Sequence, residues 1–260
     1  MQPLLTHGTL TVVGRVRDAS NATLIARAHR DAQHLDCVYK PLAGERPLWD
    51  FPDNDLAMRE CLTYAFSEAI GCARVPPTVW RSDAPAGPGM VQQWVAECAD
   101  DEQPPVTLVT DREPPAGYLA VLRARDERGR SVLLVHRDEP DLAAIAVLDV
   151  LANNADRKGG HLLRDDAGSV WAIDHGLTWH PEPKLRTVLW GWAGQPLTTA
   201  QQRLARQAAT VLAGDFGIRL ADGLGVPARE AARERAEMLL DTGVMPLPDA
   251  DSPIVPWPVF

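Results

Sequence analysis

The first hydrophobic pattern in the chain is a set of three short runs dominated by apolar and β-branched residues. They cover 9–16, 23–28 and 35–40, with polar turns between them. Runs of this length and composition are typical of an antiparallel β-meander. We expect three antiparallel strands, the last of which ends at Lys40, directly before Pro41.

The pattern then changes to a helical spacing. Apolar residues recur on one face over 55–70: Leu56, Cys61, Leu62, Ala65, Phe66 and Ala69. This spacing predicts an amphipathic helix, which Asp53 or Asn54 can cap. Glu60 lies beside the apolar stripe and can reach back to the sheet to pair with Lys40. The simpler interpretation of Glu60 is a solvated helix charge.

Two more β-like runs, 76–81 and 90–95, follow the helix, and then the composition changes. The stretch 97–117 is acidic and rich in proline, which places a boundary near residue 96. Beyond it, the sequence predicts a hairpin from 118–125 and 131–136, and a helix that Pro140 opens.

The stretch 153–175 combines a polar loop, a short strand, an Asp/Gly turn and a second strand that ends near Asp174. A hairpin folds back on itself, so Asp156 and His161 before it can approach Asp174 after it. Carboxylates beside an imidazole can hold a divalent metal and supply a base. This stretch therefore contains the strongest candidate for chemistry.

The last part of the chain is predicted to be helical and then extended. A loop over 176–194 precedes one helix capped at Thr198 or Thr199 that runs to 213, and a second helix over 227–241. The tail 245–260 contains five prolines. We expect it to lie extended over the surface, with a partner-docking role as the alternative.

Composition narrows the classes of function. A chain of 260 residues suits one large domain or two closely packed lobes. With 26 basic and 35 acidic residues the net charge is −9, which argues against sequence-independent binding to nucleic acid. The longest apolar run, 142–152, is short and broken by Asp149, so we expect no stable membrane insertion.

The four cysteines are scattered, with no CxxC pair, which favours reduced thiols in a cytoplasmic protein. The first turn of the meander contains Ser20 and Asn21, whose side chains and nearby N–H groups could meet a phosphate. An ordinary hairpin turn is the other interpretation of these residues.

The order of the parts resembles a known superfamily. Three strands, a lysine on the third strand, a helix with a glutamate, a linking strand, an Asp loop, a hairpin and a final Asp follow one another. In this order the chain resembles the protein-kinase-like superfamily, most closely its phosphatidylinositol 3/4-kinase-like branch. That branch includes small actinobacterial proteins in which strings similar to 153–158 and 173–176 recur.

Specific motifs match at three places. Lys40 corresponds to the family's strand lysine. The family loop Asp-Arg-His-x-x-Asn appears as Asp-Arg-Lys-Gly-Gly-His at 156–161, and Ile-Asp-Phe-Gly appears as Ile-Asp-His-Gly at 173–176. Lys158 thus stands in place of the family histidine, and His161 in place of the metal-binding asparagine.

The resemblance implies an α+β, bilobal protein-kinase-like fold. Residues 1–96 would form an N-lobe with an antiparallel sheet and one main helix, and 97–244 a mostly helical C-lobe, followed by the tail 245–260. The implied activity is that of an ATP-dependent kinase, an enzyme that transfers the γ-phosphate to a hydroxyl acceptor.

The resemblance also implies residues for the nucleotide. Lys40 would contact the α- and β-phosphates of ATP, with Glu60 orienting it. Asn21, together with Ser20, would lie near the phosphates. The run 90–95 would link the lobes and face adenine through backbone groups of Gln93 and Val95.

The remaining roles concern the transfer itself. Asp156 would accept the proton of the acceptor hydroxyl, and Arg157 or Lys158 would neutralise the transferring phosphate. Asp174 and His161 would hold Mg²⁺, or Mn²⁺ because imidazole is a softer ligand than an amide oxygen.

Several alternatives stay open. The altered 156–161 loop allows a pseudokinase that binds nucleotide or a partner without turnover. A metal-dependent hydrolase built on Asp174, His161, His175 and His180 is a third class. The acceptor can be an inositol phosphate or other small polyol, a phosphoinositide, or a protein hydroxyl, and the sequence leaves the oligomeric state open.

Overall fold

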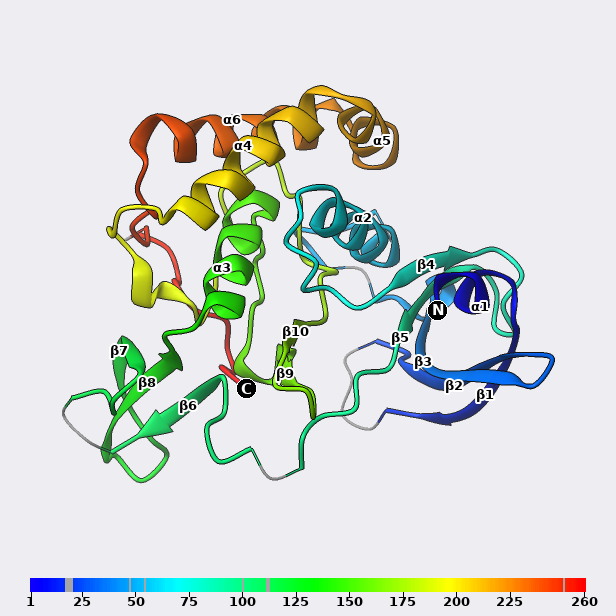
Figure 1. Ribbon diagram of the computed structural model, residues 1–260, viewed down its shortest axis with the longest axis horizontal. Helices are drawn as coiled ribbons and strands as arrows, with labels where there is room; N and C mark the ends of the chain where they lie inside the picture. Colours follow the sequence, from blue (N-terminus) through cyan, green and yellow to red (C-terminus); the bar gives the residue numbers. More distant parts are fainter. Residues whose placement is uncertain (17–20, 47, 54, 100, 111–112, 250) are drawn as a thin grey trace.

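The structure is a computed structural model that describes the whole chain except 17–20, 47, 54, 100, 111–112 and 250. Within the described residues it is a mixed α+β protein with six α-helices and three antiparallel sheets. The largest sheet stands on one side, most of the helices on the other, and a small hairpin lies between them (Figure 1).

The largest sheet has the strand order β1-β2-β3-β5-β4. Its strands are β1 (Thr9–Arg15), β2 (Leu24–Arg30), β3 (Gln33–Pro41), β4 (Thr78–Arg81) and β5 (Gly89–Gln93). The predicted meander is confirmed, because β1 pairs with β2 and β2 with β3, both antiparallel. On β3, Lys40 is paired with Met90 of β5.

Two helices accompany this sheet. The first, α1 (Gln2–His7), was not predicted, since it is only six residues long. It inserts Leu5 into a small core with Ala26 and Tyr39 of the sheet. The second, α2 (Leu56–Ala69), confirms the predicted helix. Leu56, Leu62 and Phe66 of the predicted apolar stripe are buried, whereas Ala69 is exposed and the charged Arg59 and Glu60 are buried instead.

The cap of α2 differs from the prediction. Its N-cap residue is Asp55, which makes no side-chain capping bond, and Asn54 lies outside the described residues. The carboxylate of Glu45 instead accepts the N–H groups of Leu56 and Ala57, at 3.1 and 2.7 Å. A distant acidic side chain can satisfy the first N–H groups of a helix as a local cap does.

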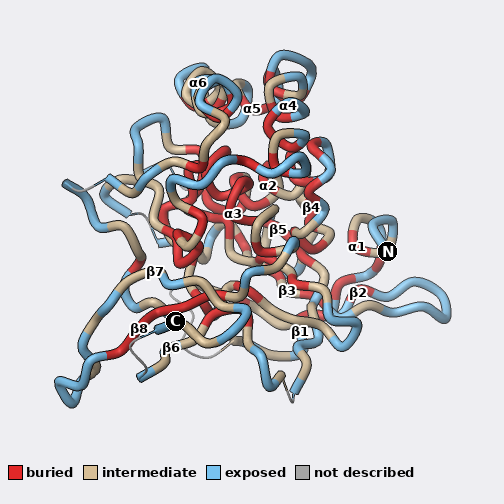
Figure 2. Tube along the Cα trace, turned by 60° about the vertical axis from the view of Figure 1, so that its left-hand side comes forward, coloured by how far each residue is buried: buried red, intermediate tan, exposed pale blue. Residues whose placement is uncertain are grey.

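The other half of the chain is built around α3 (Pro140–Ala152), which is buried over most of its length (Figure 2). Next to it, β7 (Tyr118–Arg125) and β8 (Ser131–Arg137) form the predicted hairpin. A third strand, β6 (Val106–Val109), pairs with β8. The hydrophobic pattern did not predict β6, because prolines and acidic residues surround it.

The predicted 153–175 hairpin is present as β9 (Leu162–Arg164) and β10 (Val170–Ala172). Of the last helices, α4 (Thr199–Ala213) begins at the expected cap Thr198, and α6 (Val226–Thr242) matches the second prediction. Between them lies α5 (Asp215–Leu224), which was not predicted.

The predicted boundary near residue 96 does not separate the two hydrophobic cores of the protein. The buried face of α2 packs Leu62, Phe66 and Ile70 into the main core, where Phe66 meets Trp179 edge to face. The tail also joins this core through Met245, with Val255 and Val259 packed against it. The tail is otherwise extended with most of its described residues exposed or half-buried, as predicted, so these contacts anchor a surface segment.

Two expectations from composition can be compared with the described residues. All four cysteines are free thiols. None of the described helices is both long and apolar enough to cross a membrane.

Candidate functional site

One cluster of ion pairs joins the sheet, α2 and the segment after β10. Lys40 Nζ on β3 lies 2.6 Å from Glu60 Oε1 on α2 and 3.0 Å from Asp174 Oδ1. The Lys40–Glu60 pair that the sequence suggested is present. Asp174, which lies 134 positions further along the chain than Lys40, completes a group that we call the front cluster.

The charges of the front cluster support one another. Burial disfavours the charge on Lys40, but Asp174 and Glu60 outweigh it and raise the pKa of the ammonium group. Lys40 in turn holds the pKa of Asp174 far below its usual range. Burial raises the pKa of Glu60, although Lys40 opposes that shift. Lys40 is therefore a fixed cation at neutral pH.

Asp174 also faces His161. The His161 Nε2 atom lies 3.6 Å from Asp174 Oδ2, and Asp174 has left-handed backbone at φ 58°. The N–H of Ile173 donates to the His161 carbonyl at 3.0 Å, which ties the two segments together. Burial lowers the pKa of His161 to about 4, so the imidazole is neutral at pH 7 and able to act as a ligand.

The other end of the loop presents Asp156 and Lys158. Lys158 Nζ lies 3.2 Å from Asp156 Oδ2, and the Asp156 N–H donates to Asn154 Oδ1 at 3.0 Å. Burial raises the pKa of Asp156, and Lys158 partly offsets this. Asp156 and His161 thus lie on one loop, as predicted, with Asp174 beside His161.

The predicted contact of Arg157 with the transferring phosphate is wrong, because the Arg157 side chain is fully buried. The guanidinium donates to both oxygens of Asp149 at 3.0–3.2 Å and to the Ile173 carbonyl at 2.8 Å. One of its nitrogens also lies 2.7 Å from His175 Nε2. Arg157 therefore does not reach a transferring phosphate, and only Lys158 remains a candidate for that contact.

The sequence pattern did not predict the residues that hold Arg157. Asp149 accepts from Asn154 Nδ2 at 2.9 Å and from Thr187 Oγ1 at 3.2 Å, in addition to Arg157. We call Asp149, Asn154, Arg157, His175 and Thr187 the rear cluster. The available signal was Asp149 itself, an acidic residue within an otherwise apolar run that must find partners when it is buried.

The phosphate-contact predictions on the first turn gain no geometric support. Ser20 lies outside the described residues. Asn21 Oδ1 accepts the N–H of Arg46 at 2.9 Å, and the Ala22 N–H donates to Gly44 at 3.1 Å. Asn21 therefore fastens this turn to the loop after β3, and its phosphate role stays a prediction.

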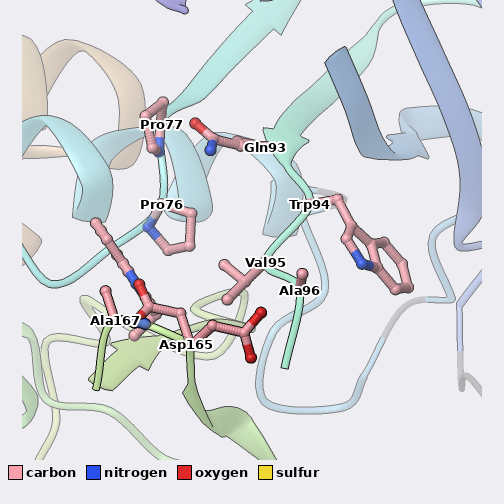
Figure 3. Close-up of a pocket in the computed structure, with 10 residues that line it drawn as sticks. Pro76, Pro77, Gln93, Trp94, Val95, Ala96, Asp165 and Ala167 are labelled. Carbon is pink, nitrogen blue, oxygen red and sulfur yellow. The ribbon is translucent and has the colours of Figure 1, made fainter. Parts of the chain in front are cut away.

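A cavity of about 360 Å³ opens between the end of β5 and the turn of the β9–β10 hairpin. Gln93 and Val95 line one side, Pro76 the next, and Asp165 and the hairpin turn the opposite side. Val95 points toward the middle of this space, whereas the neighbouring Trp94 turns away from it (Figure 3).

Gln93 and Val95, the two predicted adenine contacts, differ in whether their backbone groups are already hydrogen-bonded. The Gln93 N–H is already occupied, because it donates to the Pro77 carbonyl at 2.9 Å. Neither backbone group of Val95 is hydrogen-bonded to another residue that the structure describes. Val95 therefore offers the donor and acceptor that an adenine edge would need, and Gln93 contributes lining.

The cavity and the front cluster lie at opposite ends of the same two elements. On β5, Met90 is paired with Lys40, and Gln93 at the cavity is three residues further on. In the β9–β10 hairpin, Asp165 lies in the turn between the strands, and Asp174 lies just after β10, at the end away from the turn. Three residues of strand span about 10 Å. The two places are therefore about three strand residues apart along β5.

The histidines proposed for a metal-dependent hydrolase do not gather. His175 is buried against Arg157, and His180 lies against the ring of Phe51. Among the residues that the structure describes, no group of three or more His, Cys, Asp or Glu side chains is arranged to hold a metal ion. The pair His161 and Asp174 stays as the candidate metal-binding position.

The fold and site together define a mixed α+β protein whose large sheet, main helix and central hairpin meet in one ion-pair cluster. No family model matches the chain. The chain is 48% identical over 264 residues to Protein Rv2133c of Mycobacterium tuberculosis, across 99% of this chain and 94% of that protein. It therefore belongs to the same family as Protein Rv2133c, whose name states no activity.

Proposed function

We propose that the protein is an ATP-dependent phosphotransferase with a bilobal kinase-like fold, in which 1–96 and 97–244 form two lobes that share a core through α2. The observation that carries the proposal is Lys40 held between Glu60 at 2.6 Å and Asp174 at 3.0 Å. Phosphoryl transfer depends on positioned cations that neutralise phosphate charge, and a fixed lysine beside a carboxylate supplies the first of them.

The nucleotide would lie along β5. Adenine would occupy the cavity beside Val95, and the phosphates would extend toward Lys40, about 10 Å away along the strand. In this orientation the triphosphate end of ATP would lie at the front cluster. The free backbone groups of Val95 support this orientation over the reverse one.

Asp174 and the neutral His161 would hold the metal ion. Mg²⁺ commonly binds to one or two protein carboxylates and completes its shell with phosphate oxygens and water, so two protein ligands are sufficient. Asp174 is 47% exposed and directs one oxygen toward His161, which fits this role. The bound metal would supply charge neutralisation on the phosphates; imidazole as a ligand extends the candidates to Mn²⁺.

Asp156 would receive the proton of the acceptor hydroxyl. Its raised pKa suits a group that must take up a proton and release it again. Lys158, 3.2 Å away, would neutralise the transferring phosphate. The acceptor would be a small polyol such as an inositol phosphate, a phosphoinositide headgroup or a protein hydroxyl, and the free cysteines favour a cytoplasmic setting.

The experiment is a thermal-shift and ATP-consumption screen with Mg²⁺ or Mn²⁺ and these three acceptor classes. We expect ATP to raise the melting temperature of the wild-type protein and the Lys40→Met variant to lose that shift. Lys184→Met, which removes a lysine paired with Asp50, is the control and should keep the shift. A wild-type protein that no nucleotide stabilises would overturn the proposal.

A second candidate is a pseudokinase, a module that binds nucleotide without turnover. The specific observation in its favour is Lys158, which stands where the kinase-like superfamily has a histidine and which pairs with Asp156. This hypothesis predicts that ATP stabilises the protein while no acceptor leads to ATP consumption. It also predicts that Asp156→Asn leaves ATP binding unchanged.

A further inference from the structure

The Gly159 position on the 156–161 loop is covered by the tail. The Gly159 N–H donates to the Val259 carbonyl at 2.8 Å, and the ring of Phe260 lies directly against Gly159. A Cβ atom at Gly159 would lie closer to that ring than carbon atoms approach each other. Gly159 is consequently buried, whereas the adjacent Gly160 is exposed.

The tail reaches this position along a fixed route. It leaves the end of α6, runs along the segment 187–195 and reaches the loop that precedes β9 (Figure 1). The Ile254 carbonyl accepts from Thr187 N at 3.1 Å and from Trp190 Nε1 at 2.7 Å. Pro256 is buried between these anchors and the loop. The contact with Gly159 is thus the end of an anchored segment.

Thr187 connects these anchors to the rear cluster. Its backbone N–H holds the tail, and its hydroxyl donates to Asp149, the carboxylate that also holds Arg157. The 156–161 loop is therefore held at two points: the rear cluster binds Arg157, and the tail contacts Gly159. Lys158 is the residue between those two points.

Support on this side matters because the loop contains two glycines. Glycine loses more conformational freedom on ordering than any other residue, so a Gly-Gly pair holds its neighbours poorly by itself. The segment 159–161 forms only a single turn of 3₁₀ helix. The Lys158 side chain is paired with Asp156 on the same loop, so the tail would act by fixing the backbone from which both side chains extend.

We propose that Val259 and Phe260 are positioning residues that hold the 156–161 loop in the geometry for phosphoryl transfer. This inference rests on the proposed function. The tail would set the rate of transfer by fixing Lys158 and Asp156. It would leave ATP binding unchanged, because Lys40 and the cavity beside Val95 lie on the sheet side of the site, and the Ile173 N–H holds His161 at 3.0 Å independently of the tail.

The test is a matched pair of variants of the full chain. Gly159→Ala introduces a methyl group where Phe260 lies, whereas Gly160→Ala places one where no atom is nearer than 4.0 Å. We expect Gly159→Ala to accelerate amide exchange over 158–160 and to reduce ATP consumption at least tenfold. The ATP-induced thermal shift should be unchanged, and Gly160→Ala should match the wild type in all three measurements.

Phe260 variants separate positioning from general stability. Phe260→Ala should repeat the effect of Gly159→Ala, and Phe260→Tyr, which keeps the ring, should restore the rate. Unchanged amide exchange in Gly159→Ala would overturn the contact. Faster exchange with an unchanged or increased rate of ATP consumption would overturn the positioning role.

The exchange measurement needs no enzyme activity, which keeps the two proposals distinguishable. If the wild-type protein neither binds nor consumes ATP, the proposed function fails, and the role of the tail in transfer fails with it. In that case the amide exchange of Gly159→Ala and Gly160→Ala still decides whether the tail holds the loop.

Discussion

The front and rear clusters use the same types of residue in opposite ways. In the front cluster, Lys40 and Asp174 are partly accessible, with 19% and 47% of their side chains exposed. In the rear cluster, Arg157 and Asp149 are both 0% exposed and saturated with hydrogen bonds. An accessible ion pair can exchange a partner for a ligand, whereas the donors and acceptors of this buried pair are already occupied by protein groups.

The difference is set by the backbone of the loop. Arg157 forms a parallel bridge with Thr187, and both side chains reach the buried Asp149. In extended backbone, successive side chains point to opposite sides. Asp156 and Lys158 accordingly pair with each other away from the rear cluster. Residues adjacent in sequence thus have different roles.

Removing the buried cation should have the largest effect on stability. In Arg157→Leu, the carboxylate of Asp149 stays buried without its ionic partner, which typically costs about 3–5 kcal/mol. We expect the free energy of unfolding in urea to fall by that amount. The neighbouring variant Lys158→Leu is the control and should change it by less than about 1 kcal/mol. Equal losses in both variants would erase the distinction between the clusters.

Removing the front carboxylate should affect activity instead. In Asp174→Asn, which keeps a residue type that tolerates the left-handed backbone, the candidate metal position loses its anionic ligand, and loss of one such electrostatic contact commonly lowers a rate about 100-fold or more. The free energy of unfolding should change by less than about 1 kcal/mol, because Asp174 is half-exposed and Lys40 keeps Glu60. ATP consumption and urea unfolding should be measured on the same preparation. A large loss of stability would contradict the assignment.

A buried group outside both clusters extends the comparison to pH. His136 is 0% exposed, its Nε2 accepts the Gly191 N–H at 2.9 Å, and burial lowers its pKa to about 4. In the unfolded chain the His136 imidazole takes up a proton near pH 6.5, whereas in the folded protein it does so only near pH 4. The stability that neutral His136 contributes is therefore fully present above pH 6.5 and is lost as the pH falls toward 4. The loss approaches about 3 kcal/mol at most.

Urea unfolding at several pH values between 7.5 and 4.5 measures this slope. The His136→Gln variant should have a shallower dependence on pH than the wild type, whatever its stability at pH 7.5. Parallel curves for the two proteins would show that His136 does not contribute to the slope.

The smallest effect on stability is expected at the edge of the front cluster. His161→Asn restores the residue type that the kinase-like resemblance implies at this position, and the free energy of unfolding should change by less than about 1 kcal/mol. An amide oxygen suits Mg²⁺ better than an imidazole does, so the ratio of activity with Mg²⁺ to activity with Mn²⁺ should rise. An unchanged ratio would argue against His161 as a metal ligand.

Much of the fold could be predicted from local pattern. The meander, α2, the hairpin β7–β8 and the hairpin β9–β10 follow from alternation, helical spacing and turn residues, which act over a few positions. The pair Lys40–Glu60 could also be anticipated, because a strand end and a packed helix bring the two residues together.

The parts that the sequence did not reveal depend on long-range packing. Glu45 caps α2 from eleven positions away, and Phe260 covers Gly159 from the far end of the tail. Arg157 lies in a motif where charged residues suggest a phosphate contact, and only the burial of Asp149 shows its structural role. Hydrophobic periodicity contains no information about such partners.

The position of α2 has a consequence for how the chain folds. The sheet β1–β5 has its own core, formed by residues near one another in the sequence. Phe66 on α2 instead packs against Trp179 and Phe216, which lie more than a hundred positions later in the chain. Contacts of that separation form late, because a long loop must close first. A fragment cut at residue 96 would therefore expose the apolar face of α2 and aggregate, although its sheet is complete.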